Sequence, residues 1–372
     1  MNKTKQKRRM FLYSLTLVLF VLITGCSRYK VVDQINIVDI MGFGYNGVEG
    51  NLLGSVLVHE YREGQEKDYV KLISSSGNNA TESLTNINQK SPYILEIAKT
   101  RVLVLGKEYT KEVGIKDIVS SICRNAKIGS RVKIVISDEP LPLLFQKLAK
   151  EEGDYLPNLI EQNMVYHNFP YSNLHIFLYD FYGKGRNAII PYINLSKDGE
   201  IIIEKMAVIG SDSKLKMILD REHTTLMKLY IDKSKEMFFT IPIEKNNQKG
   251  TITIKSVYGR SRIIPNVSDS SIEYFLGLKS VLVDYPTWIN LGNEFPFLEK
   301  ETEKYIDNKV QDLFNQFKEN DVDPLGIGDD FRSQDKHWKE EDFYKSVYPF
   351  VTMKTNITSS IFQSGVGDDG NE

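Results

Sequence analysis

The chain has 372 residues, of which 41% are hydrophobic and 26% are charged. This length and composition are ordinary for folded proteins of two or three domains, and they exclude an intrinsically disordered chain. The 47 basic and 49 acidic residues give a net charge of −2, which does not favour nucleic acid or an anionic lipid surface as a partner.

The N-terminal segment has the pattern of a lipoprotein signal peptide. Basic residues come first, an apolar stretch follows at residues 10–22, and residues 23–26 place small side chains before Cys26. The apolar stretch is shorter than the roughly 20 residues that a membrane-spanning helix needs. We therefore predict cleavage before Cys26 and a diacylglyceryl thioether on its sulfur, which would hold the protein at the extracytoplasmic face of the membrane. The alternative is an uncleaved N-terminal anchor.

Processing at Cys26 has two consequences for the mature chain. Removal of residues 1–25 takes away five of the 47 basic residues and leaves 42 against 49 acidic ones, a net charge of −7. The lipid, and not a basic surface, is then expected to attach the protein to the membrane. Cys123 is left without a disulfide partner, and we predict a helix-surface or core thiol there because no histidine lies near it.

The first half of the chain is predicted to mix strands and helices. The glycines of residues 42–47 are expected to form the turn of a hairpin whose second strand is residues 52–61. They also spell G-x-G-x-x-G, but no helix follows them, so a dinucleotide site is not expected. Thr81 is the expected N-cap of a helix, and Ile94, Ile97 and Ala98 have helical spacing. Further along, we predict strands at residues 101–106 and 131–136, and helices at residues 115–124 and 140–152, with a helical or mixed segment up to residue 182.

The second half is predicted to be rich in strands, with one long amphipathic helix. The turn at residues 196–199 is the expected domain boundary, and residues 245–250 form either a hairpin tip or a small linker. The expected strands are residues 201–209, 214–219, 251–257, 272–283 and 351–361, and the helix is residues 302–320.

These elements predict an α+β fold, a multi-subdomain mixed α/β ectodomain with mainly antiparallel sheets. The expected divisions are a signal peptide at 1–25, domains at 26–199 and 200–365 (the second possibly split near 246–250), and a disordered tail at 366–372.

No motif for catalysis or for metal binding is present in the sequence. The five histidines are scattered, and no P-loop or nucleophile elbow can be traced. The densest carboxylate group follows the long helix and lacks the spacing of a calcium-binding loop. A helix stop followed by tight turns explains this segment better, so we predict no cofactor, no metal and no catalytic residues. The carboxylates are those of Asp321, Asp323, Asp329 and Asp330.

Several short motifs in a fixed order carry a family resemblance. They are the lipid-attachment cysteine, the segment with Gly106, Gly114 and Arg124, and residues 323–328 followed by Trp338. In this order and spacing the chain resembles the Ger(x)C family, the lipoprotein C subunits of spore germinant receptors, from the cysteine to about residue 365. The resemblance implies a non-enzymatic ectodomain that assembles with two multi-spanning membrane subunits, an A-type and a permease-like B-type. It also implies a location at the spore inner membrane.

Some residues depart from the family pattern, and two other classes of protein stay open. Ser27 and Arg28 stand where the family often has Trp-Asp, and Arg124 is followed by Asn125 in place of aspartate. These differences bear on which subfamily the chain resembles more than on its resemblance to the family. A solute-binding lipoprotein of a transporter would also need a lipid anchor, but its two lobes would repeat βα units. A lipid-anchored hydrolase would need a nucleophile beside a base, and none is legible.

The loop after the long helix is predicted to have a structural role. Pro324 would stop the helix, Gly326 and Gly328 would allow unusual backbone angles, and Trp338 would seal the helix against the final strand. Trp338→Ala is then expected to cost roughly 3–5 kcal/mol, while Asp329→Asn should change little. The alternative is that Trp338 is exposed and contacts a membrane subunit.

Overall fold

The structure is a computed structural model that describes residue 13 and residues 35–45, 51–60, 69–151, 153–166, 169–231 and 236–363. Cys26, the predicted tail and, apart from residue 13, the predicted signal peptide lie outside these residues. None of the helices in the described part is both long enough and apolar enough to span a membrane.

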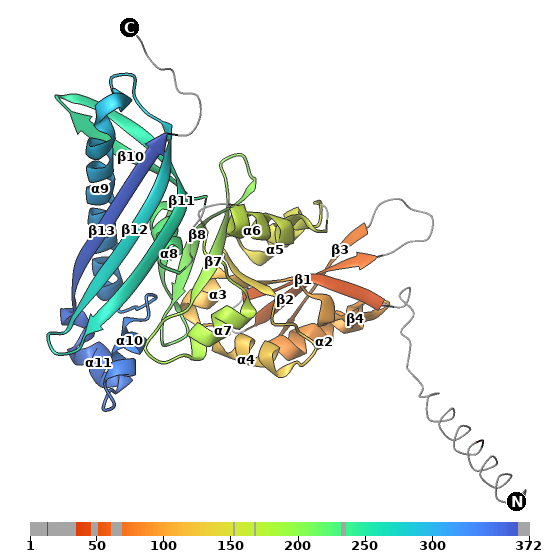
Figure 1. Ribbon diagram of the computed structural model, residues 1–372. Helices are drawn as coiled ribbons and strands as arrows, with labels where there is room; N and C mark the ends of the chain where they lie inside the picture. The colour runs from red at the N-terminus through yellow and green to blue at the C-terminus, as the bar shows by residue number, and fades with distance from the viewer. Residues whose placement is uncertain are drawn as a thin grey trace, which may run out of the picture. The chain divides into compact units, whose positions relative to one another are not determined.

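The nine strands β1 to β9 form one sheet with the order β3-β2-β1-β5-β6-β7-β8-β9, and β4 also pairs with β1 (Figure 1). The central strands β1, β5, β6 and β7 are parallel, whereas the strands toward both edges are antiparallel. The strands are β1 (Ile35–Tyr45), β2 (Leu52–Glu60), β3 (Tyr69–Gly77), β4 (Ile94–Glu96), β5 (Val102–Gly106), β6 (Lys133–Ser137), β7 (Ile189–Leu195), β8 (Ile201–Ile209) and β9 (Leu215–Leu219).

Helices cover both faces of this sheet, so the central strand β5 is buried and apolar on both sides. In β5, Val102 and Val104 belong to one core and Leu103 and Leu105 to the other, as the two-residue period of a strand requires. Helices α5 and α6 supply side chains to the first core, and α2, α4 and α7 supply side chains to the second. The helices are α2 (Ala80–Lys90), α3 (Lys107–Glu112), α4 (Lys116–Arg124), α5 (Leu141–Leu148), α6 (Tyr155–Tyr166), α7 (Leu174–Tyr182) and α8 (Arg221–Ile231), with a 3₁₀ turn at Ile97–Lys99.

The second sheet has four strands in the order β10-β11-β12-β13, and the long helix α9 (Leu291–Glu319) packs on one of its faces (Figure 1). Strands β10 to β12 are antiparallel neighbours, whereas β13 is parallel to β12 because three helices lie between them in the chain. The other elements are β10 (Phe238–Lys245), β11 (Gln248–Asn266), β12 (Ser271–Asp284), β13 (Thr352–Gln363), α10 (Ile327–Gln334), α11 (Glu340–Ser346) and a 3₁₀ turn at Tyr348–Phe350.

Side chains of α9 also cover the outer edge of β13. The backbone N–H groups of Ser359 and Ile361 donate to Glu303 Oε1 at 2.8 Å and to Glu299 Oε1 at 2.9 Å, respectively. Farther along the helix, Gln311 Nε2 donates to the carbonyl oxygen of Met353 at 3.2 Å. The helix therefore contributes hydrogen bonds to the sheet as well as its apolar stripe.

The mixed α/β fold expected from the sequence is confirmed, but the glycines of the first hairpin lie elsewhere. Gly42 and Gly44 are inside β1, which continues to Tyr45, and the rest of the predicted turn, residues 46–47, lies outside the described residues. A Cβ placed on Gly42 would lie 2.7 Å from the Phe145 ring, and one on Gly44 would lie 2.9 Å from Leu141. These glycines therefore let α5 approach the sheet.

Three local predictions also need correction. The N-cap of α2 is Asn79 and not Thr81, because the Asn79 side chain accepts the N–H of Glu82 at 2.9 Å. Residues 94–98 form a short strand and a 3₁₀ turn in place of a helix, since β4 pairs with β1. Helix α9 begins at Leu291, where Asn290 caps it, about three turns before the expected start.

Both expected turns of the second half are hairpin tips. The turn at residues 196–199 joins β7 to β8, so the first sheet continues across the expected boundary. At residues 245–250, Asn246 and Asn247 have positive φ and connect β10 to β11 by a two-residue turn, which excludes the linker. One continuous core contains side chains from both sheets. The division into domains at 26–199 and 200–365 stays a prediction.

Candidate functional site

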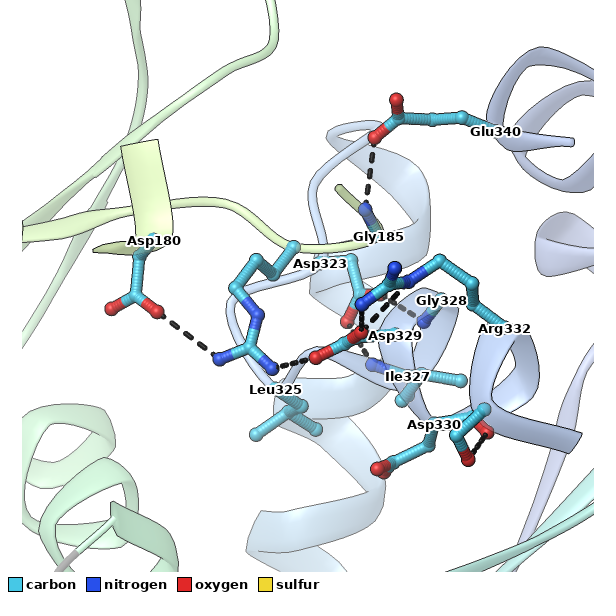
Figure 2. A network of polar contacts seen from close by, with 12 residues as sticks. Asp180, Gly185, Asp323, Leu325, Ile327, Gly328, Asp329, Asp330, Arg332 and Glu340 are labelled. Atoms are coloured by element: carbon cyan, nitrogen blue, oxygen red, sulfur yellow. Dashed lines mark hydrogen bonds and ion pairs between the residues drawn. The ribbon is translucent and has the colours of Figure 1, made fainter. Parts of the chain in front are cut away.

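The loop that follows α9 is hydrogen-bonded to the segment that connects α7 to β7. The N–H of Asn187 donates to the carbonyl oxygen of Asp323 at 2.9 Å, and the N–H of Asp323 donates to Asn187 Oδ1 at 2.7 Å. The N–H of Asp329 donates to the carbonyl oxygen of Gly185 at 2.9 Å. We call the contact between residues 185–187 and residues 323–329 the junction (Figure 2).

Two glycines allow the backbones to meet at the junction. Gly185 has a φ of +77°, and a Cβ placed on it would lie 2.3 Å from the backbone nitrogen of Asp329. On the opposite side, a Cβ on Gly328 would lie 2.9 Å from the Cα of Gly185. Gly326 has a φ of +75°, which matches the predicted role of a glycine that permits a left-handed turn. The same expectation was wrong for Gly328, which lies inside α10 without a positive φ and serves the close approach of the backbones instead. The junction therefore requires glycine on both of its chain segments.

The carboxylate of Asp323 is the buried centre of the junction. Asp323 is fully buried, and its two oxygens accept the N–H of Ile327 at 3.0 Å and the N–H of Gly328 at 2.7 Å. The hydroxyl of Tyr344 donates to the same carboxylate at 3.0 Å. Asp323 thus satisfies backbone donors at the start of α10 that would otherwise be buried without a partner.

A network of charges surrounds this centre. The guanidinium of Arg186 lies between Asp180, at 3.2 Å, and Asp329, which also accepts hydrogen bonds from Arg332 (Figure 2). Burial alone would raise the pKa of Asp329, but the hydrogen bonds from Arg332 and Arg186 outweigh it and lower that pKa. Asp329→Asn, expected from the sequence to change little, would replace one of the two oxygens, each of which accepts from a different arginine, with an amide NH₂. It would also remove the negative charge that both arginines face.

The pKa of Asp323 predicts how stability changes with pH. Burial raises this pKa to about 6, against the hydrogen bonds that favour the carboxylate, whereas an aspartate in the unfolded chain titrates near ~3.9. The folded protein then takes up a proton between pH 7 and pH 5 and the unfolded chain does not, so stability increases as the pH falls. We expect Asp323 to contribute about 1 kcal/mol to this increase.

Urea denaturation of the ectodomain at the two pH values checks this expectation. Asp330, whose pKa burial likewise raises to about 6, acts in the same direction. Asp330→Asn should therefore reduce the pH dependence without abolishing it. A wild-type protein that is less stable at pH 5 than at pH 7 would contradict the expected sign.

Trp338 lies at the margin of a small aromatic core next to the junction. This core contains Phe314 of α9 together with Phe343 and Tyr348, and Trp338 is half-buried with its ring 6.0 Å from that of Phe343. Its indole nitrogen is buried and has no hydrogen-bond partner among the described residues. The position of the Trp338 ring supports packing against α11. That this packing stabilises the loop, as expected from the sequence, stays a prediction.

Because the Trp338 ring is only half-buried, we expect Trp338→Ala to cost about 2–3 kcal/mol, less than truncation of a fully buried aromatic. Chemical denaturation measures this cost. Phe343→Leu in the same core provides a comparison, since it replaces the ring that Trp338 contacts with a smaller aliphatic side chain. A Trp338→Ala variant that unfolds at the wild-type midpoint would favour the alternative, in which this side chain contacts a partner.

The other described residues of the family pattern lie in the first sheet or in the helices and loops beside it, and no described hydrogen bond, ion pair or ring contact joins them to the junction. Gly106 ends β5, and a Cβ on it would lie 3.2 Å from the Cα of Gly44. Gly114 has a φ of +93° and abuts the carbonyl oxygen of Ser213. Arg124 is exposed at the end of α4. The residue before it, Cys123, is also exposed, and partial desolvation raises the pKa of its thiol. The expected helix-surface thiol is confirmed.

A cleft of about 540 Å³ opens beside Gly106, at the carboxyl ends of the parallel strands. Two of the charged groups that line it are paired with each other: Lys107 Nζ lies 2.8 Å from Asp138 Oδ1, which also accepts the hydroxyl of Tyr192 at 2.6 Å. No group of three or more His, Cys, Asp or Glu residues in the described chain is placed to hold a metal ion.

Sequence reasoning missed the residues on the other side of the junction. Asp180, Gly185, Arg186 and Asn187 belong to the end of an aromatic helix and the turn after it. The glycines at 183 and 185 could have indicated a turn, but nothing in the sequence points to a partner more than 130 residues away. We take the junction as the candidate functional site because the family-pattern residues Asp323, Gly326 and Gly328 meet a partly buried charge network there. Only the structure shows that residues 185–187 and residues 323–329 lie together.

Comparisons with known proteins cover almost the whole chain. Two family models match it, one described as a spore germination protein N-terminal domain at residues 28–195 and one as spore germination B3/GerAC like, C-terminal, at residues 204–365. The spore germination protein GerQC of Bacillus cereus is 26% identical over 363 residues, which cover 95% of this chain and 98% of GerQC. The crystal structure of the GerBC protein is similar in fold, with a TM-score of 0.56 and 14% identity over 87% of this chain and 97% of that chain.

Proposed function

Because the chain belongs to the Ger(x)C family of spore germination proteins, we propose that it is the lipid-anchored C subunit of a nutrient germinant receptor that triggers germination. The match of both family models in the expected order is the observation that carries this proposal. The solute-binding alternative is not favoured, since both models and the curated relative are described as spore germination proteins.

The lipid anchor is part of the proposal. The first family model begins at residue 28, two residues after Cys26, which supports a mature chain that starts at this cysteine. A diacylglyceryl group supplies two acyl chains, and two chains are what stable attachment to a bilayer usually takes. The protein would then lie on the extracytoplasmic face of the membrane, and in spores at the inner membrane.

Cys26→Ala should leave an unmodified and unprocessed precursor and weaken or abolish the nutrient response, because the thiol is the lipid acceptor. Mass spectrometry of the membrane fraction measures the modification and the N-terminus. Cys123→Ala is the matched control, since this exposed thiol of α4 should be dispensable for both. An unmodified Cys26 in the wild-type protein would refute the lipid anchor.

A non-enzymatic role as a subunit requires partners. We propose that these are two multi-spanning membrane proteins of the same receptor, an A-type and a permease-like B-type subunit, without cofactor or metal. The test is affinity purification of the detergent-solubilised wild-type lipoprotein from spores, which should retain both. Purification of the lipoprotein alone, under conditions that preserve the Cys26 modification, would refute the assembly and leave the lipid anchor unaffected.

A further inference from the structure

One face of the second sheet is covered by α9, and the other is open over β11, β12 and β13 (Figure 1). Buried and more accessible side chains alternate along β12. Residues 272, 274, 276, 278 and 280 are buried on the side of α9, and the residues between them point to the open face. The register brings side chains of all three strands together there. Neighbouring rows are Ile264, Glu273 and Lys354; Arg262, Phe275 and Asn356; Arg260, Gly277 and Thr358; and Tyr258, Lys279 and Ser360.

These four rows concentrate positive charge in a protein that is acidic as a whole. They contain four exposed basic side chains and a single acidic one, Glu273. Toward the other end of the sheet, cations have acidic neighbours, as in Lys249 with Glu244 and Lys255 with Glu236. Within the described chain, no acidic side chain pairs with the four cations of these rows. The four cations are Arg260, Arg262, Lys279 and Lys354. We call these four residues and the nearby aromatic residues Tyr258, Phe275 and Phe362 the basic face.

Aromatic side chains stand among the cations. The Arg262 guanidinium lies 5.3 Å from the centre of the Phe275 ring, and Tyr258 is 42% exposed beside Lys279. Phe362, at the end of β13, is 43% exposed on the same face. Cations interleaved with exposed aromatic rings are typical of protein surfaces that rest at the headgroup level of a bilayer.

We propose that the basic face docks on the headgroups of anionic phospholipids. Charge complementarity selects an anionic surface, and the spread of the cations over three strands fits a lipid surface better than a single acidic side chain. Lysine and arginine near an anionic membrane contribute additively, about fivefold in partitioning for each cation. This docking is separate from the lipid on Cys26 and would fix which side of the ectodomain faces the bilayer.

The test uses the chain from Ser27 onward, which lacks the lipid-bearing cysteine and contains the whole compact unit of residues 36–372. This protein should co-sediment with vesicles of phosphatidylcholine and phosphatidylglycerol, but not with vesicles of phosphatidylcholine alone, and salt should release it. The double variant Arg260→Gln and Lys279→Gln should bind roughly 30-fold more weakly.

The matched control removes two exposed lysines of α9, as Lys300→Gln and Lys304→Gln, and lowers the net charge by the same amount. Equal weakening by both double variants would refute the basic face, because overall charge would then explain the binding. Absence of wild-type binding to the anionic vesicles also overturns the proposal. If the Arg260 and Lys279 variant instead loses the receptor's membrane subunits on purification, the occupant is an acidic protein surface. The vesicle outcomes do not depend on lipidation of Cys26 and are therefore separate from the test of the proposed function, whereas the purification uses the lipoprotein and the receptor subunits of that proposal.

Discussion

Asp323→Ala is expected to lower the free energy of unfolding by about 3–5 kcal/mol. The substitution leaves the N–H groups of Ile327 and Gly328 and the hydroxyl of Tyr344 without their shared acceptor. Asp323 is fully buried, so water does not replace the lost carboxylate without rearrangement. Urea denaturation of the ectodomain measures the change.

Two variants separate the carboxylate from the general effect of a substitution in this loop. Asp321→Asn changes an exposed side chain at a positive φ of 51°, which asparagine tolerates, and should leave stability nearly unchanged. Asp323→Asn keeps the shape but presents an amide NH₂ to one of the donors, so it should lie between wild type and Asp323→Ala. Wild-type stability of Asp323→Ala would show that the buried carboxylate is not the centre of the junction.

Gly185→Ala is expected to separate the two segments of the junction and to cost about 3 kcal/mol or more. The new Cβ would lie 2.3 Å from the backbone nitrogen of Asp329, and backbone cannot move aside as a flexible side chain does. The hydrogen bonds at Asp329 and Asn187 should weaken together. Hydrogen exchange at the amides of residues 187, 323 and 329 reports the opening, and denaturation reports the energy.

Gly199→Ala is a control matched in backbone conformation. Gly199 has a φ of +80°, close to that of Gly185, but a Cβ on it would meet nothing within 4 Å. Left-handed strain alone should therefore cost about 1 kcal/mol at either position. Equal losses at the two glycines would mean that strain, and not the close approach of the backbones, explains the effect at Gly185.

Local patterns were sufficient to predict most of the elements. The apolar run of β5, the helical spacing of α4 and the stripe of α9 each depend on near neighbours in the chain, and the structure confirms all three. Pattern reasoning failed where a distant side chain decides the conformation. Gly42 and Gly44 resemble turn residues, but Phe145 and Leu141 pack on them and keep them in a strand.

The candidate site was predicted only on one side. Asp323, Gly326 and Gly328 were expected to shape a tight turn, and the φ of Gly326 agrees with that expectation. Their partners at residues 185–187 could not be predicted, because the contact depends on how α7 and α9 end in space. The basic face was hidden for a similar reason. Its cations come from three strands, and an overall negative charge gave no sign that they share one surface.

The covered edge of β13 limits how this protein can associate with others. An exposed edge strand invites a further strand from another chain, which is a common route to aggregation. Here the carboxylates of Glu299 and Glu303 already accept N–H groups that an incoming strand would need, and they would repel its carbonyl oxygens. Fibre growth by strand addition is therefore blocked at β13, and crowding of many copies on one membrane should not join them through this edge.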